Sequence, residues 1–357
     1  MNKSDLVAAR LRNQRLSSTT FARPADVVRW FGAVQAQDFH GAKWALGLRM
    51  RAATNASVEE AFNRGEIVRT HLLRPTWHFV TPEDLRWLLA LTGPRVSLRC
   101  GSAYRAYELD PAVLKRTNSI IAKALRGGKH LTRAELKAKL NQAGIAADDS
   151  VRMGHILLHA EAAGVVCSGP LKGKQFTYAL LEERVRDGLR LSRDEALAEL
   201  TRRYFSSHGP ATLVDFVWWS GLTTNDARAG IALLDRELQK LSIEKITYWC
   251  SNSTSTANPG ARAHLLPAYD EYNVAYKNRE TVFHPTAASQ LTAWGALGPT
   301  VVVDGKLIGI WKVTPKPDSI TIALTSPKAL TRAEKQAITA GAESYAAFLG
   351  LPCVTHM

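Results

Sequence analysis

Apolar side chains recur at helical spacing in residues 24–34, after a proline at the first turn. The apolar positions are Val27, Val28, Trp30, Phe31 and Val34. This pattern predicts an amphipathic helix, and the helical period is lost beyond it. Side chains two residues apart share a face only in extended backbone, so Gln35 and Gln37 can reach one ligand only if the chain straightens there. Asp38 would then face the other way.

The next elements predict a helix followed by a β-hairpin. Residues 57–65 predict a short helix with Ser57 at its cap and a glycine at its end. Residues 67–73 and 76–80 are rich in β-branched and aromatic side chains and flank the turn signal Arg74-Pro75. Helices followed by a hairpin are typical of a winged helix.

The same order of elements recurs twice. After a helical connector near residues 83–106, the second copy has predicted helices at 117–127, from 131 and at 150–159, and strands at 165–167 and 175–178. Its second helix opens with a capping box, Thr132 with Glu135. The third copy has predicted helices at 196–205, at 213–220 and from 224, and a wing strand at 244–249.

The last part of the chain has a different pattern. Residues 251–260 are of low complexity and predict a flexible linker. Residues 301–313 predict two strands around an Asp304-Gly305 turn, and residues 320–324 predict another strand. A capping box, Thr331 with Glu334, opens a last helix that runs to about residue 350.

These elements predict an α+β protein with three tandem winged-helix (helix-turn-helix) units, a small antiparallel β-barrel and a C-terminal helix. The predicted boundaries are 1–112 for the first unit with its connector, 113–190 for the second, 191–258 for the third, and 259–357 for the barrel with the last helix.

Composition narrows the class of protein. The four cysteines are far apart and form no Cys-x-x-Cys motif, which argues against a disulfide framework or a zinc site and favours a reducing compartment. No signal-peptide pattern and no run of 18 apolar residues is present in the sequence. We therefore expect a cytoplasmic, nucleoid-associated protein that does not enter a membrane.

The charge is strongly basic and unevenly distributed. The formal net charge is +14, and the first 190 residues hold 30 of the 46 Lys and Arg but only 17 of the 32 Asp and Glu. Such an excess favours a polyanion as partner, although a generally basic composition without a specific partner would look the same. The predicted DNA-contacting residues, expected to line one concave surface, are Arg49, Arg51, Arg69, Arg74, Arg152, Lys172 and Lys174.

Several motifs together resemble the AlkZ/YcaQ-like DNA glycosylases, a family built of tandem winged helices followed by a β-barrel. The motifs are GAVQAQD at 32–38, RTHLLRPTWH at 69–78, HGPAT at 208–212 through Asp215 to WSG at 219–221, LLPAYDEY at 265–272, and VDG at 303–305 with GIW at 309–311. The resemblance implies catalytic roles for Gln35 and Gln37. A glutamine at the second place is similar to the AlkZ branch, which unhooks interstrand crosslinks and removes alkylated purines.

Other residues beside the motif are candidates for the lesion pocket. Trp77 and His78 lie on the adjacent hairpin, where an aromatic ring suits an unstacked base. Trp77 could equally fill the core of the first unit. Asp38 could act as a base if its side chain turned inward.

The predicted chemistry needs no metal and no cofactor. His155 and His159 lie four residues apart on one predicted helix, but neither the glutamate of a His-Glu-x-x-His motif nor a third ligand is nearby in the sequence. We expect a monofunctional DNA N-glycosylase that works as a monomer without an obligate protein partner on double-stranded DNA carrying alkylated or crosslinked purines. The alternative is a non-catalytic winged-helix DNA-binding protein or transcriptional regulator, for which a palindromic site and a dimer are expected.

Overall fold

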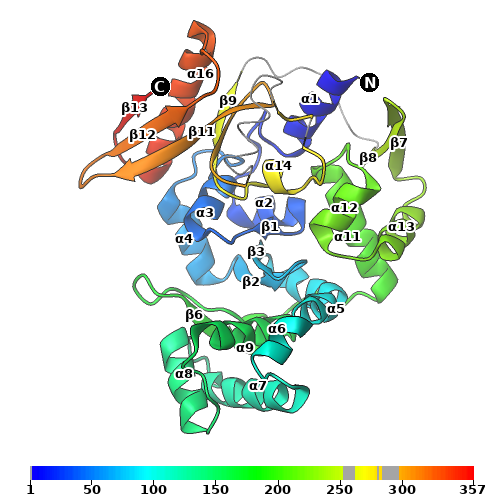
Figure 1. The fold of residues 1–357 in the computed structure, drawn as a ribbon, viewed down its shortest axis with the longest axis vertical. Coiled ribbons are helices and arrows are strands. Elements are labelled where there is room, and N and C mark those ends of the chain that lie inside the picture. The colour runs from blue at the N-terminus through cyan, green and yellow to red at the C-terminus, as the bar shows by residue number, and fades with distance from the viewer. Residues whose placement is uncertain (1, 252–261, 280, 284–296) are drawn as a thin grey trace.

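The computed structural model describes residues 2–251, 262–279, 281–283 and 297–357. Figure 1 shows the second helix-and-hairpin unit at one end of the molecule and the sheet that carries the C-terminus at the other. The first unit lies between them, and the third unit lies beside it. No helix in the described ranges is long and apolar enough to cross a bilayer.

The first unit consists of three helices and a three-stranded sheet. Its elements are α2 (Pro24–Phe31), β1 (Val34–Gln35), α3 (Phe39–Gly47), α4 (Asn55–Arg64), β2 (Val68–Leu72) and β3 (Thr76–Val80). The sheet order is β1-β3-β2, and both pairings are antiparallel. α2 ends earlier than predicted because Gly32 adopts a φ of 82°, which glycine tolerates best. The cap of α4 is Thr54 rather than the predicted Ser57, which is the third residue of the capping box.

The second unit repeats this arrangement. The connector consists of α5 (Pro82–Arg99) and α6 (Gly101–Ala106), and the unit consists of α7 (Pro111–Leu125), β4 (Leu131–Thr132), α8 (Arg133–Gln142), α9 (Ser150–Ala162), β5 (Val166–Ser168) and β6 (Thr177–Leu180). The sheet order is β4-β6-β5. The capping box at the start of α8 is confirmed. α7 begins six residues earlier than predicted, because Asp110 caps it and a proline occupies its first turn.

The third unit has three helices and a two-stranded hairpin. It follows the short helix α10 (Leu181–Arg184) and consists of α11 (Arg193–Ser207), α12 (Leu213–Ser220), α13 (Thr224–Leu233), β7 (Leu238–Ile243) and β8 (Ile246–Ser251). Gly221 ends α12 in the left-handed conformation, as predicted. An isolated bridge between Ala211 and Trp249 stands where the other two units have a short first strand.

The C-terminal part forms an open sheet. Its elements are β9 (Ala263–Leu266), α14 (Glu271–Val274), β10 (Thr300–Val303), β11 (Lys306–Pro315), β12 (Ile320–Thr325), α16 (Arg332–Leu349) and β13 (Cys353–His356). The order is β13-β12-β11-β10-β9, so the described strands form no closed barrel and the predicted barrel is not confirmed. β13 pairs with β12 in parallel, and the other pairings are antiparallel. Most of the predicted linker, residues 252–260, lies outside the described residues.

Two hydrophobic cores join the first unit to its neighbours. One combines Phe31 and Phe79 with Trp311 and Phe348 of the C-terminal part. Another combines the hairpin of the first unit, including Leu72, with the helices of the third unit. The second unit shares a separate core with the connector. Both residues of β1 are buried, and packing from several segments restricts the movement of this strand.

Candidate functional site

The Gln35–Gln37 stretch leaves α2 and crosses to the hairpin. In β1, Val34 pairs with Phe79 and Gln35 pairs with His78, while the peptide N–H of Ala36 donates to the carbonyl of Trp77 at 2.7 Å. The chain is extended at Val34–Gln35, which is part of what a shared ligand of Gln35 and Gln37 would require, and Gln37 lies beyond the strand. Gln35 is buried, and Gln37 is exposed.

The two glutamine side chains have different neighbours. The Oε1 atom of Gln35 is 3.5 Å from an Nη atom of Arg74, at the limit of a hydrogen bond. The Oε1 atom of Gln37 accepts weakly from the peptide N–H of Trp77 at 3.4 Å. Both amides therefore retain donors and acceptors for a ligand.

Asp38 is used by the fold. Its side chain accepts from the peptide N–H of Gly41 at 3.1 Å and caps α3. The side chain is exposed, and the capping bond aims its carboxylate at the start of a helix.

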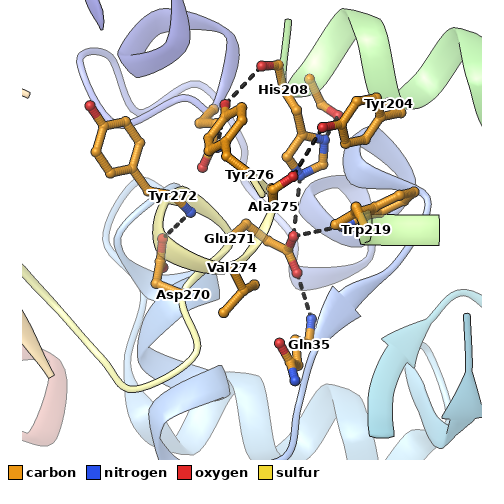
Figure 2. A network of polar contacts seen from close by, with 12 residues as sticks. Gln35, Tyr204, His208, Trp219, Asp270, Glu271, Tyr272, Val274, Ala275 and Tyr276 are labelled. Atoms are coloured by element: carbon orange, nitrogen blue, oxygen red, sulfur yellow. Dashed lines mark hydrogen bonds and ion pairs between the residues drawn. The ribbon is translucent and has the colours of Figure 1, made fainter. Parts of the chain in front are cut away.

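A buried carboxylate lies behind Gln35. The Oε1 atom of Glu271 accepts from the peptide N–H of Gln35 at 2.7 Å, and its Oε2 atom accepts from the indole N–H of Trp219 at 2.9 Å and contacts the Nε2 atom of His208 at 3.2 Å. Figure 2 shows these three partners converging on Glu271 from β1, α12 and the end of α11. Only 1% of Glu271 is exposed.

Burial and hydrogen bonding act in opposite directions on this carboxylate. Burial raises the pKa of Glu271, but hydrogen bonds from His208 and the Gln35 peptide outweigh it, so the pKa lies below its ordinary value. Burial lowers the pKa of His208, which is stacked on Tyr204 at 4.8 Å between ring centroids. At neutral pH the carboxylate is therefore ionised. The Nε2 atom of His208 faces Glu271, and its Nδ1 atom lies 2.9 Å from the hydroxyl oxygen of Ser207, which donates its proton to the carbonyl of Arg203 at 2.6 Å.

The hairpin supplies two further groups. His78 is buried, and burial together with the charge of Arg74 lowers its pKa to about 3. Its Nδ1 atom contacts the carbonyl of Thr76 at 2.9 Å, and its Nε2 atom has no partner among the described residues. The guanidinium of Arg74 lies 5.6 Å from the ring centroid of Trp218, and burial lowers its pKa. Because Nδ1 donates to the Thr76 carbonyl, the Nε2 atom of neutral His78 can accept a hydrogen bond beside Gln35.

The opposite face of the hairpin borders a cavity of about 640 Å³. The guanidinium of Arg69 lies between two rings, 4.3 Å from the centroid of Trp77 and 4.8 Å from that of Phe176, and it donates to the carbonyl of Ala36 at 2.9 Å. Trp77 is only partly buried, and its ring centroid lies 4.3 Å from that of His71. Trp77 therefore contributes both to packing and to the cavity wall. Four cations border the cavity: Arg69, Arg133, Lys137 and Lys174.

The predicted DNA-contacting residues do not share one surface. Arg49 is 1% exposed and forms a bidentate ion pair with Asp270 at 2.8 and 2.9 Å, so it lies outside the predicted surface. Arg152 donates to two backbone carbonyls, and Lys172 pairs with Glu135 at 2.8 Å. Lys174 is exposed and borders the cavity. Arg51 is exposed and donates to the carbonyl of Thr20.

The sequence interpretation missed Glu271, His208 and Trp219 as site residues. Each lies in a motif that carried the family resemblance, but no local pattern shows that these segments meet at Gln35. A buried acid within the apolar and aromatic stretch at 265–276 was the available signal, because carboxylates are seldom buried without a partner. Within the described ranges, no cluster of three or more His, Cys, Asp or Glu side chains could hold a metal ion.

Comparisons with known proteins identify the family and agree with the fold. Residues 28–348 match the family model described as DNA glycosylase AlkZ-like. An interstrand DNA cross-link repair glycosylase from Streptomyces sahachiroi is 27% identical over 337 residues, which cover 87% of this chain and 90% of that protein. The solved structure of Streptomyces sahachiroi DNA glycosylase AlkZ superposes with a TM-score of 0.82 at 23% identity and covers 99% of both chains.

The match to the family model supports an enzyme that cleaves N-glycosidic bonds in DNA rather than a non-catalytic regulator. The chain belongs to the AlkZ-like family of DNA glycosylases. The structural likeness, at 23% identity, supports the fold alone.

The buried ion pair of Arg49 gives a test of its role. Arg49→Met leaves the Asp270 carboxylate buried without its cation, and we expect the free energy of unfolding to fall by about 3–5 kcal/mol. Arg51→Met should change it by less than about 0.5 kcal/mol, because Arg51 is exposed. Urea unfolding of both variants measures this difference. Equal stabilities of the two variants would show that the Arg49 pair does not hold the fold.

Proposed function

We propose that this glycosylase hydrolyses the N-glycosidic bond of cationic alkylpurines, N7-alkylguanine and N3-alkyladenine, and unhooks interstrand crosslinks formed through such bases. The observation that carries the proposal is that, in the part of the chain that the structure describes, no carboxyl group beside Gln35 and Gln37 is free to act as an acid. Glu271 is buried with both oxygens engaged, and Asp38 caps α3.

The reaction makes a positive charge on the sugar. Cleavage of the C1′–N bond passes through an oxocarbenium-like transition state, and glycoside hydrolases usually provide two carboxylates for it. An amide neither gives nor takes a proton usefully near pH 7. Its oxygen can accept from water and present a partial negative charge to the developing cation. Gln35 and Gln37 can therefore hold the nucleophilic water but cannot protonate the departing base.

A leaving group that is already cationic removes the need for an acid. The electron pair of the broken C1′–N bond neutralises the positive charge of N7-alkylguanine or N3-alkyladenine, and the base departs neutral. Water forms the new bond to C1′ and releases its proton to solvent. The name of the Streptomyces sahachiroi relative refers to interstrand crosslink repair, and a crosslinked N7-guanine carries the same charge.

The surroundings of the glutamines suit a distorted nucleotide. Neutral His78 offers an unpartnered nitrogen on the buried side, and Trp77 borders the cavity on the other side. We assign both residues to a lesion pocket that extends around the edge of the hairpin, with His78 on one face and Trp77 on the other, since aromatic rings stack on unpaired bases. Asp38 lies at the edge of this pocket and takes no part in proton transfer.

DNA contacts are assigned to four of the predicted cations that make no ion pair among the described residues, three of which lie on the hairpin or border the cavity. These are Arg51, Arg69, Arg74 and Lys174. The order of helices and the sheet orders β1-β3-β2 and β4-β6-β5 support winged helices in the first two units, with the predicted unit boundaries. Three unlike units lack the two-fold symmetry of dimeric regulators, which favours a monomer on double-stranded DNA. The proposed chemistry requires no cofactor.

The glutamine roles are tested by release of N7-methylguanine from duplex DNA under single-turnover conditions. We expect Gln35→Ala and Gln37→Ala each to lower the rate about 100-fold or more, because each loses a preorganised polar group. Asp38→Asn should keep most of the activity, since asparagine also caps helices. Wild-type rates in both glutamine variants would contradict the proposal.

Trp77→Ala belongs in the same series. A role in the pocket predicts a fall in rate larger than any fall in thermal stability. A rate that follows the folded fraction would assign Trp77 to the core instead.

The DNA surface is tested by a matched pair of lysines on one turn. Lys174→Ala should weaken binding to undamaged duplex with little sequence preference and reduce the salt dependence by about one counterion. Lys172→Ala should have a smaller effect, because its ammonium group already pairs with Glu135. Fluorescence anisotropy at several salt concentrations measures both. Equal effects of the two substitutions would argue against a specific role for Lys174.

A further inference from the structure

We propose that Glu271 is a positioning residue of this site, whose ionised carboxylate fixes the backbone of Gln35 and supplies the negative charge that a cationic sugar requires. The inference rests on the proposed function, because it concerns the transition state of glycosidic hydrolysis.

Glu271 differs from most other buried carboxylates of the protein in its partners. Asp84 pairs with Arg203, Asp215 lies 3.9 Å from Arg10, and Asp270 pairs with Arg49. The hydrogen-bond partners of Glu271 among the described residues are a peptide N–H, an indole N–H and a histidine, and none of them is a permanently charged group. The fold therefore keeps a negative charge next to Gln35 without an arginine or lysine to pair with it.

Burying a carboxylate without a cationic partner is energetically costly. Removing a carboxylate from water costs several kcal/mol, and neutral donors offset only part of this cost. A buried charge held in this way is characteristic of functional sites. A purely structural role at this position could be filled by a neutral acceptor.

Other charged groups near Gln35 affect how strongly the Glu271 carboxylate attracts a cationic sugar. Arg74 is positive, lies beside the Gln35 amide and makes no ion pair among the described residues. Burial lowers the pKa of His78 to about 3 and also lowers the pKa of His208. A DNA phosphate bound to Arg74 would neutralise this cation, and Glu271 would then be the uncompensated charge behind the sugar.

The contribution of Glu271 is expected mainly in the transition state. The charge on the sugar develops only as the base departs, so an interaction with it raises kcat more than it lowers KM. A unit charge acting over several ångströms at an effective dielectric constant near 20 changes the rate on the order of 10- to 100-fold. Glu271 itself takes up and releases no proton during the reaction.

Two abasic-site analogues separate charge from shape. A pyrrolidine analogue is protonated on its ring nitrogen near pH 7, whereas a tetrahydrofuran analogue of similar shape is neutral. We expect wild-type protein to bind a duplex containing the pyrrolidine at least about 10-fold more tightly than one containing the tetrahydrofuran. Glu271→Gln should reduce this preference to about 1- to 3-fold and leave affinity for undamaged duplex unchanged.

Asp84→Asn is the matched control. Asp84 is equally buried and also accepts from an indole N–H, that of Trp87 at 3.0 Å, but among the described residues no hydrogen bond or ion pair joins it to the 35–37 stretch. This variant should be destabilised and keep the wild-type preference. A wild-type protein without preference, or a Glu271→Gln variant that retains it, would overturn the inference. Failure of wild-type protein to release N7-methylguanine would instead overturn the proposed function, since binding of the analogues is measured separately.

A second variant tests the same inference if Glu271→Gln does not fold. Trp219→Phe removes one donor to the carboxylate, which raises the pKa of Glu271. The ionised form is then lost at a higher pH, so the acid limb of the kcat profile should move upward while KM stays nearly constant. An acid limb that stays at its wild-type pH would contradict a role for the charge of Glu271.

Discussion

The hydrogen bond from the peptide N–H of Gln35 to the Glu271 carboxylate is the contact on which the site depends. It joins β1 to α14, two segments more than 200 residues apart in the sequence, at 2.7 Å. The second carboxylate oxygen ties α12 and the end of α11 to the same point. Because all of these groups are buried, a shift of any one of them would leave a polar atom without a partner, which costs about 1–3 kcal/mol or more. The backbone of Gln35 is therefore held in place before DNA arrives.

Packing around this contact explains why the site lies where it does. The first unit shares one core with the C-terminal sheet and another with the third unit, so β1 is supported from two sides. The second unit, with its own core, contributes Phe176 and Lys174 to the cavity on the far face of the hairpin. The hairpin β2–β3 thus separates a buried polar network from an open basic cavity. The Gln35–Gln37 stretch runs along the edge of the hairpin, from the polar network toward the cavity.

Local signals in the sequence predicted much of the fold. The capping boxes at Thr132 and Thr331 and the glycine after α12 mark helix ends through contacts between residues a few positions apart. The sequence also indicated that the helix ends before Gln35, because the helical period is lost there, and the structure has a short strand at Val34–Gln35. Long-range contacts could not be predicted in this way. Arg49 looks like a surface cation until its partner, 221 residues away, is known.

The same limit applies to the site and to the sheet. The sequence pointed to Gln35 and Gln37, and it placed Glu271 and His208 only in motifs without a role. A run of short strands predicts pairing but not whether the sheet closes, and the described strands leave it open at β9 and β13.

The central claim is that the site relies on a leaving group that is already charged. Single-turnover excision by wild-type protein from two duplexes of one sequence, one containing N7-methylguanine and the other hypoxanthine, tests this claim most directly. The account predicts release of N7-methylguanine and no release of hypoxanthine above background, because the neutral base would need an acid that the site does not offer. Efficient excision of hypoxanthine would contradict it.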